Sequence, residues 1–217
     1  MDLQNIIWTL TIDNNNRYFK KYLDLIEHTI KEDSKILDRR VKELKDVKPV
    51  FDEQTGWYDP GDELADMAYE LEEMEQLMYR TFVIGAFIFM ESQINNLCGQ
   101  VKKLHNQKFS YKDLRGTGIN RSINYLKKAL EISFPTNDRT SREFELARII
   151  RNALVHSEGE IDENNILMVN SYIEEFPNRL KWDHKRIVIT HEYAISLIEL
   201  NKKICLEVEN HNKVKDF

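Results

Sequence analysis

Residues that break helices are scarce in this chain. It has 7 glycines and 4 prolines among 217 residues, about half the average frequency or less for each. Cysteine is rarer still, with 2 residues, and the longest apolar run without a charge, Phe82 to Met90, spans nine residues. Because a membrane-spanning helix needs about 20 apolar residues, this run is expected to form a buried helix segment. These scarcities exclude collagen-like, disulfide-stapled and membrane-spanning classes.

The remaining composition is typical of long amphipathic helices around one core. Hydrophobic residues make up 41% and charged residues 31% of the chain, which is too apolar for disorder and too charged for a membrane protein. A chain of this length forms one domain or at most two and buries enough surface to need no disulfide or metal. Residues 1–5 lack the basic start and apolar stretch of a secretion signal, so a cytoplasmic location is expected.

The two cysteines, Cys98 and Cys205, each lie in an apolar helical context. One interpretation makes them a redox pair or metal ligands. The other makes them small buried hydrophobic residues in a reducing compartment, and it is favoured because free cysteine is among the most buried residue types. The sequence contains no glycine-rich phosphate loop, nucleophile elbow or paired metal-ligand spacing, so no cofactor or metal is expected.

The apolar periodicity predicts a mainly all-α fold, a helical bundle with two long N-terminal helices. An apolar or irregular lead-in over residues 1–13 precedes the first helix, and a loop over residues 49–61 separates the first two. The expected helices, in chain order, cover residues 15–47, 62–106, 119–132, 141–155, 162–176 and 190–210. A small β-hairpin is expected near residues 179–190, where β-branched residues alternate. We expect one compact unit, with residues 1–61 as a long helix and loop and residues 62–217 as the bundle.

Polar residues and breakers mark the expected helix ends. The run Asn14 to Asn16 is a candidate N-cap for the first helix, Asp62 for the second and Thr117 for the third. Breaks are expected at residues 114–118 and 134–137. Inside the second helix, Glu91 follows the apolar run directly. A buried carboxylate without a partner is costly, so Glu91 is expected either to face a cleft or to pair with a cation.

Charge is distributed unevenly along the chain. The net charge is −6, but the segment from Gly99 to His156 contains 12 basic and 5 acidic residues, a net charge of +7. Two interpretations stay open. The segment forms a basic surface suited to a nucleic acid, or its lysines and arginines simply solvate the exposed faces of helices.

One hexapeptide in this segment combines residues suited to phosphate chemistry. In Arg151-Asn152-Ala153-Leu154-Val155-His156, histidine can move protons near neutral pH and arginine offers a planar fork of donors to phosphate oxygens. At 100° per residue, Arg151 falls inside the apolar arc of its helix, together with Val155. It therefore needs a carboxylate, a phosphate or a partner chain. Arg151 and His156 are about 140° apart on an ideal helix, so they share a face only if the helix ends between them or a second subunit completes the site.

The hexapeptide resembles the signature of the HEPN superfamily of all-helical domains. That signature is an arginine, a polar residue that is often asparagine, three further residues and a histidine. The context is similar, with a buried apolar helix upstream and the motif at a helix end. The resemblance covers about residues 62–212, and residues 1–61 align with nothing. The same Arg-to-His spacing occurs at Arg179–His184 and Arg186–His191, but there no asparagine follows the arginine.

The resemblance implies a homodimer that cleaves RNA without a metal, as a toxin or in abortive phage defence. The ribose 2′-hydroxyl would attack its own phosphate, with His156 handling the proton, Arg151 the phosphate charge, and Asn152 positioning either. Glu91 is a candidate to orient Arg151. The implied partners are RNA, a second copy of the chain, and an antitoxin or nucleotidyltransferase. Candidate RNA-binding residues in the basic segment are Lys102, Lys103, Arg121, Arg142 and Arg148.

A non-catalytic function is the alternative. Other members of the superfamily have no known catalysis and serve as nucleotide-binding or scaffolding helices, and a purely structural dimer is a third reading. In a non-catalytic module, Arg151 is expected to be paired with a carboxylate of its own chain, and His156 to act as a capping residue near a helix C-terminus, where a cation is favoured.

Overall fold

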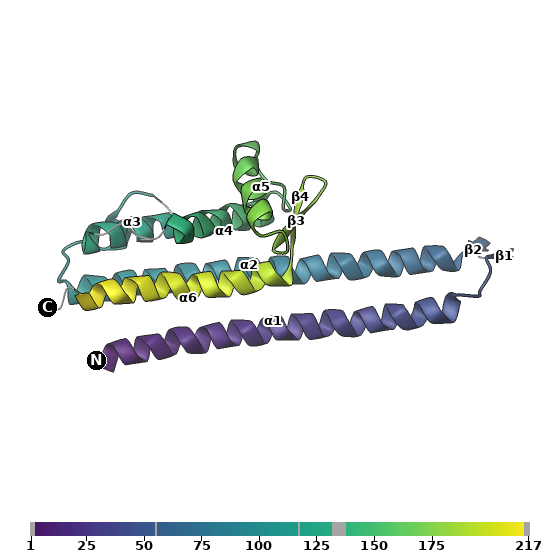
Figure 1. The fold of residues 1–217 in the computed structure, drawn as a ribbon, viewed down its shortest axis with the longest axis horizontal. Helices are drawn as coiled ribbons and strands as arrows, with labels where there is room; N and C mark the ends of the chain where they lie inside the picture. The colour runs from purple at the N-terminus through teal and green to yellow at the C-terminus, as the bar shows by residue number, and fades with distance from the viewer. Residues whose placement is uncertain (1–2, 55, 117, 132–137, 215–217) are drawn as a thin grey trace.

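The computed structural model describes residues 3–54, 56–116, 118–131 and 138–214, and these form a mainly α-helical fold, as predicted (Figure 1). The helices are α1 (Leu3–Leu44), α2 (Pro60–Leu104), α3 (Gly118–Leu130), α4 (Asp138–His156), α5 (Ile166–Glu175) and α6 (His191–Val214). Two antiparallel β-hairpins pair β1 (Val50–Asp52) with β2 (Gly56–Tyr58) and β3 (Leu180–Asp183) with β4 (Arg186–Ile189). Short 3₁₀ turns cover Tyr111–Asp113 and Glu163–Asn165.

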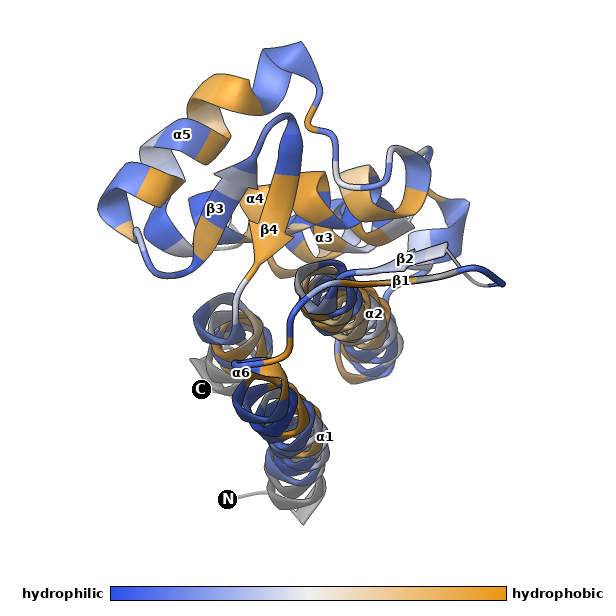
Figure 2. Ribbon diagram, turned by 90° about the vertical axis from the view of Figure 1, so that its right-hand side faces the viewer, coloured by the Kyte–Doolittle hydropathy of each residue, from blue (hydrophilic) through white to orange (hydrophobic). Residues whose placement is uncertain are grey.

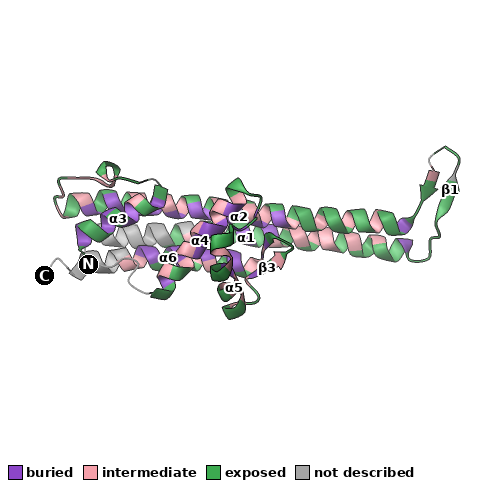
Figure 3. Cartoon of the chain, turned by 90° about the horizontal axis from the view of Figure 1, so that it is seen from above, coloured by how far each residue is buried: buried purple, intermediate pink, exposed green. Residues whose placement is uncertain are grey.

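The two longest helices, α1 and α2, lie side by side as a helical hairpin (Figure 1). The β1–β2 hairpin joins them at one end. Helix α6 packs against the N-terminal half of α1 and the C-terminal half of α2, while α3 and α4 cover α2 from another side. Residues 28–44 of α1 and 60–75 of α2 extend beyond this bundle as a two-helix arm, called here the stalk. Exposed and half-buried residues dominate the stalk, whereas buried residues concentrate in the bundle (Figure 3).

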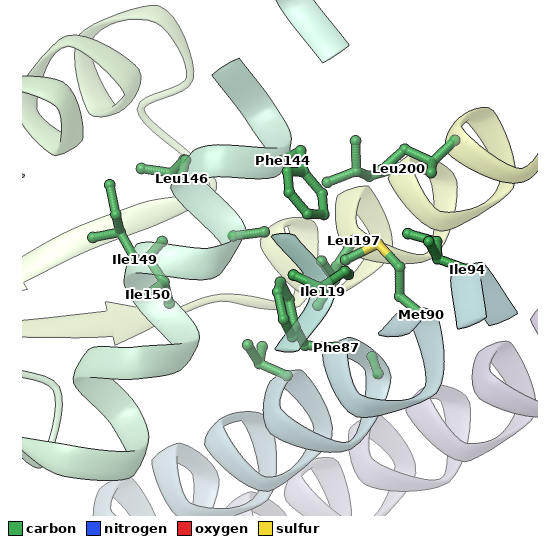
Figure 4. Packing of buried hydrophobic residues seen from close by; sticks show 14 of the residues in the cluster. Phe87, Met90, Ile94, Ile119, Phe144, Leu146, Ile149, Ile150, Leu197 and Leu200 are labelled. Carbon is green, nitrogen blue, oxygen red and sulfur yellow. The ribbon is translucent and has the colours of Figure 1, made fainter. Parts of the chain in front are cut away.

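The C-terminal half of α2 forms the centre of the core, as its apolar run predicts. Phe82, Phe87 and Met90 are almost fully buried. Side chains from α2, α4 and α6 meet there, including Leu197 and Leu200 (Figure 4). Burial of large apolar side chains at this density is the main source of stability for a fold of this kind.

Helices α3 and α4 both run along α2, in directions opposite to each other. Helix α4 is antiparallel to α2, because the ring of Phe144 stacks on Phe87 at 6.2 Å whereas the chain just beyond α4 reaches β4. There the N–H of Ile187 donates to the carbonyl of Gly159 at 3.0 Å, and β4 is itself hydrogen-bonded to Gln76 of α2. Seen end-on, the β3–β4 hairpin lies beside α4 and α5 and away from α1 (Figure 2).

Gln76 attaches the β3–β4 hairpin to α2. Its amide Nε2 donates to the carbonyl of Ile189 at 3.1 Å, and its Oε1 accepts from the N–H of Ile189 at 3.0 Å. Gln76 and Ile189 are both buried. The side chain thus satisfies the outer edge of β4 as a neighbouring strand would.

The first helix corrects one expectation. Residues 3–13 are helical, so Asn14 to Asn16 lie inside α1 and do not cap it. The chain has no glycine or proline before Pro49, and α6 holds this part of α1. Asn201 Nδ2 donates to Asn16 Oδ1 at 3.2 Å, and Lys202 pairs with Asp13 at 2.8 Å. Tertiary packing therefore overrides the local preference of asparagine for a cap.

The segment expected as a loop at residues 49–61 contains the β1–β2 hairpin. Gly56, with φ of +86°, permits the turn. Helix α2 begins at Pro60, and its N-cap is Asp59 in place of Asp62, because Asp59 Oδ1 accepts from the N–H of Gly61 at 2.8 Å. The predicted cap Thr117 and the break at 134–137 lie outside the described residues. The remaining helix ends agree with the prediction to within a few residues.

Among the residues that the structure describes, no helix combines the length and the apolar character needed to cross a membrane.

Candidate functional site

The three motif residues lie in the last two turns of α4. The helix includes both Arg151 and His156, so it does not end between them. It ends directly afterwards, where the N–H of Gly159 donates to the carbonyl of Ala153 at 3.0 Å and Gly159 adopts φ of +92°. A glycine in this conformation is a common helix end. The two motif side chains therefore keep their angular separation of about 140° within one chain.

Glycine at position 159 is required by its backbone conformation. Space does not exclude a side chain, because an added Cβ would be in ordinary van der Waals contact, 3.6 Å from the carbonyl oxygen of Ile187 and 3.8 Å from Leu154 Cδ2. We expect Gly159→Ala to lower the free energy of unfolding by about 1–2 kcal/mol, because a residue with a Cβ is strained at positive φ. Urea denaturation measures this. Gly85→Ala is the matched control, since Gly85 lies inside α2 with no atom within 4 Å of an added Cβ, and we expect it to stabilise by about 0.5–1 kcal/mol. A loss no larger than in the control would contradict the role of Gly159.

The solvent-facing side of α4 carries most of the motif. The buried residues of α4 are Thr140, Phe144, Leu146, Ala147, Ile149, Ile150 and Ala153. On the opposite side, Arg148, Asn152 and His156 follow one another at intervals of four residues, and His156 is exposed. Val155 was expected in the buried arc but is 42% exposed, because the bundle covers the side of α4 centred on Ile150.

Arg151 lies at the border between the buried and exposed sides. Its guanidinium is half-buried, and its Nη1 donates to Asn152 Oδ1 at 3.0 Å. Its Nε is buried and has no hydrogen-bond partner among the described residues. No carboxylate within the described ranges forms an ion pair with it. An intramolecular carboxylate, as expected of a non-catalytic module, is therefore not seen. The guanidinium is therefore open to an anion or to a partner chain.

Glu91 is half-buried and lies beside the start of α3. An ideal Cβ on Gly118 would be 3.6 Å from Glu91 Oε1, where the N-terminal end of a helix favours an anion. Counted from the contact of Phe87 with Phe144, Glu91 lies one turn further along α2, and Arg151 lies two turns further along the antiparallel α4. The two residues thus lie on opposite sides of that contact. This corrects the expectation that Glu91 orients Arg151 of the same chain.

The candidate RNA-binding residues divide into two groups. Lys102 and Lys103 lie at the C-terminal end of α2, whereas His156 lies near the level of Gln76. Residues 76 and 102 of one straight helix are about 39 Å apart along its axis. Arg121 belongs with the lysine group, since its guanidinium lies 5.5 Å from the ring centre of Tyr111, just beyond the end of α2. These residues therefore do not line one cleft with His156 of the same chain.

Two arginines of α4 complete the set. Arg148 donates from Nε to Glu145 Oε2 at 3.0 Å, and this guanidinium holds the pKa of Glu145 below its usual value. Its charge is therefore partly offset. Arg142 is exposed and borders a groove of about 310 Å³ between α4 and α5.

The α4–α5 groove was not anticipated from the sequence. Its aromatic wall is formed by Tyr172 and Phe176, with ring centres 4.9 Å apart, and Arg179 stacks on Phe176 at 4.2 Å. The sequence signal for this groove was a tyrosine and a phenylalanine four residues apart, followed three residues later by an arginine. Glu143 is mostly buried and lies within ion-pair distance of Arg139 and Arg179, so it anchors both arginine side chains.

Both cysteines behave as the second interpretation expects. Cys98 and Cys205 are buried free thiols, and burial raises the pKa of each to about 12. They are therefore poor nucleophiles near neutral pH. Within the described part of the chain, no group of three or more His, Cys, Asp or Glu residues is arranged to hold a metal ion.

Comparisons with known proteins identify no relative. No protein-family model, no curated protein and no solved structure matches this chain.

Proposed function

We propose that this protein is an endoribonuclease of the toxin or phage-defence type that acts as a homodimer and needs no metal ion. The observation that supports it is the state of Arg151. A half-buried guanidinium, oriented by Asn152 and without a carboxylate partner in the described chain, is a ready site for a phosphate. The nearby His156 is exposed and free to reach a substrate.

The proposed reaction forms one bond and breaks another at phosphorus. The 2′-oxygen of the ribose attacks its adjacent phosphate, and the bond to the 5′-oxygen of the next nucleotide breaks. The products are a 2′,3′-cyclic phosphate and a 5′-hydroxyl end. His156 accepts the proton of the 2′-hydroxyl and then, as the imidazolium, donates a proton to the leaving 5′-oxygen. Arg151 stabilises the charge that develops on the phosphate, so the chemistry needs no Lewis acid.

A dimer supplies what one chain lacks. Arg151 and His156 of one chain point about 140° apart, and a second copy facing the exposed side of α4 would place its own motif opposite. Val155, exposed between them, offers an apolar contact for such a pairing. A symmetric dimer has two such composite sites, each with Arg151 from one chain and His156 from the other. A cognate antitoxin or nucleotidyltransferase would restrain the activity in a cell.

Incubation of the full chain with RNA in the presence of a metal chelator tests the proposal. We expect cleavage that leaves cyclic phosphate ends, and none of a DNA of the same sequence or of an RNA methylated at every 2′-oxygen. The Arg151→Ala variant, purified in parallel, controls for a contaminating ribonuclease, because a contaminant would cleave in both samples. Intact RNA with the wild-type chain, or cleavage only after a divalent metal is added, would refute the proposal.

A further inference from the structure

The stalk carries an apolar groove that the bundle does not cover. It has a volume of about 220 Å³ and is lined by Ile36 and Leu37 of α1 and Met67, Leu71 and Met74 of α2, with Asp33 and Glu70 at its edges. The groove shares no residue with the motif on α4 and lies on the stalk side of Gln76, where α2 leaves the bundle (Figure 3).

The groove is open because the stalk has only two helices. Where only two helices pack together, the part of each apolar stripe that faces neither helix stays exposed to water. Ile36 is 49% exposed and Met74 is 47% exposed, whereas most apolar residues of α2 inside the bundle, such as Phe82, are buried. Methionine side chains are flexible and adapt to varied partner surfaces. The geometry is that of a groove that accepts one more helix.

The charge beside the groove indicates which kind of helix would bind there. Between Pro60 and Tyr79, α2 has seven acidic residues and no lysine, arginine or histidine. Asp66, Glu70 and Glu73 fall on the side of α2 next to Met67 and Met74, and the part of the chain that is described contains no ion pair to any of these three. At three- and four-residue spacings, such like charges cost a helix about 0.2–0.5 kcal/mol per pair. The fold therefore bears an acidic row that it does not itself neutralise.

Two other carboxylates of the same helix are crowded. Burial and the neighbouring carboxylate of Glu72 raise the pKa of Glu75. The acidic row disfavours RNA and anionic lipid surfaces as occupants of the groove. A second copy aligned along the stalk would bring a like-charged row against it, which is also unfavourable.

We propose that the stalk groove binds an amphipathic helix of a partner protein whose lysines and arginines flank its apolar stripe. The apolar residues of that helix would pack against Ile36, Leu71 and Met74, and its cations would pair with Glu70 and its neighbours. This interaction is independent of the ribonuclease activity, because the groove shares no residue with the motif on α4.

A designed peptide tests the groove in the full chain. The probe is a helix-forming peptide of leucine and lysine, about two heptads long, with all leucines on one face. The matched peptide has glutamate in place of each lysine. Titration calorimetry is expected to show binding of the lysine peptide and none of the glutamate peptide. Hydrogen exchange is expected to show new protection over residues 33–37 and 67–74.

Two single substitutions on α2 separate the groove from general attraction. Glu70 borders the groove, whereas Glu72 points away from it, and both are exposed glutamates of one helix. Glu70→Lys is expected to weaken binding of the lysine peptide about tenfold, and Glu72→Lys less than about twofold. Met74→Gln removes apolar contact without adding charge and is expected to weaken binding as well.

Three results would overturn the proposal. Equal losses for Glu70→Lys and Glu72→Lys would show diffuse attraction to an acidic surface. Binding of both peptides, or of neither, would contradict the stated partner chemistry. A stalk-mediated dimer that Met74→Gln dissociates in sedimentation would show that a second copy is the occupant.

Discussion

His156→Ala is expected to slow RNA cleavage by about 10²–10⁴-fold, the usual contribution of a positioned acid–base group. His156 is exposed at the end of α4, so its removal leaves no cavity and the fold is expected to stay intact. Single-turnover cleavage of a labelled RNA gives the rate, and an unchanged helical circular dichroism spectrum confirms the fold.

His184→Ala is the matched control for this loss. Arg179 and His184 repeat the spacing of the motif, and the His184 side chain is 95% exposed in the turn of the β3–β4 hairpin. It lies outside the proposed site, so its variant is expected to cleave at the wild-type rate. If both histidine variants cleave like the wild type, His156 has no role in catalysis.

Mixing two inactive variants determines whether the site is shared between subunits. Because Arg151 and His156 diverge on one helix, we expect each working site to take Arg151 from one chain and His156 from the other. A mixed dimer of Arg151→Ala with His156→Ala then keeps one intact site. After equal mixing and random exchange, the activity is expected to recover to about a quarter of wild type. No recovery, despite proven subunit exchange, would place the site within one chain.

Helices of this chain were predictable because most of its few breakers lie at or near their ends. Pro49, Gly116 and Gly159 each follow or precede a helix. The errors have tertiary causes. Asn16 resembles a cap residue, yet α6 supplies it with Asn201, and the helix continues through it. The strands β1 and β2 have three residues each, too few for a periodic signal.

The spacing of the site residues along α4 was predictable, but their placement relative to the rest of the bundle was not. Spacing alone indicated the angle between Arg151 and His156 and an end of the helix near Gly159. It did not indicate which side of α4 the bundle covers, and so Val155 was assigned to the wrong side. The position of Glu91 beside Gly118 depends on where α3 begins, which only the packing of α3 on α2 determines.

Gln76→Leu is expected to cause the larger of the two stability losses proposed for this protein, about 2–4 kcal/mol in the free energy of unfolding. Leucine fills a similar volume but leaves both the N–H and the carbonyl of Ile189 buried without their partners at 3.0 and 3.1 Å. Each unsatisfied buried group costs about 1–3 kcal/mol. Urea unfolding with an unchanged m-value gives the loss.

Gln93→Leu is the matched control, because Gln93 is also a buried glutamine of α2. Its Oε1 has no hydrogen-bond partner among the described residues, so replacing it removes an unsatisfied group, and the change is expected to stay within about 1 kcal/mol. Similar losses in both variants would mean that the volume of glutamine, and not its pairing with β4, stabilises the fold. A loss confined to Gln76→Leu, with faster hydrogen exchange at Ile189, would show that this side chain holds the β3–β4 hairpin, and through it the end of α4 that carries His156, against α2.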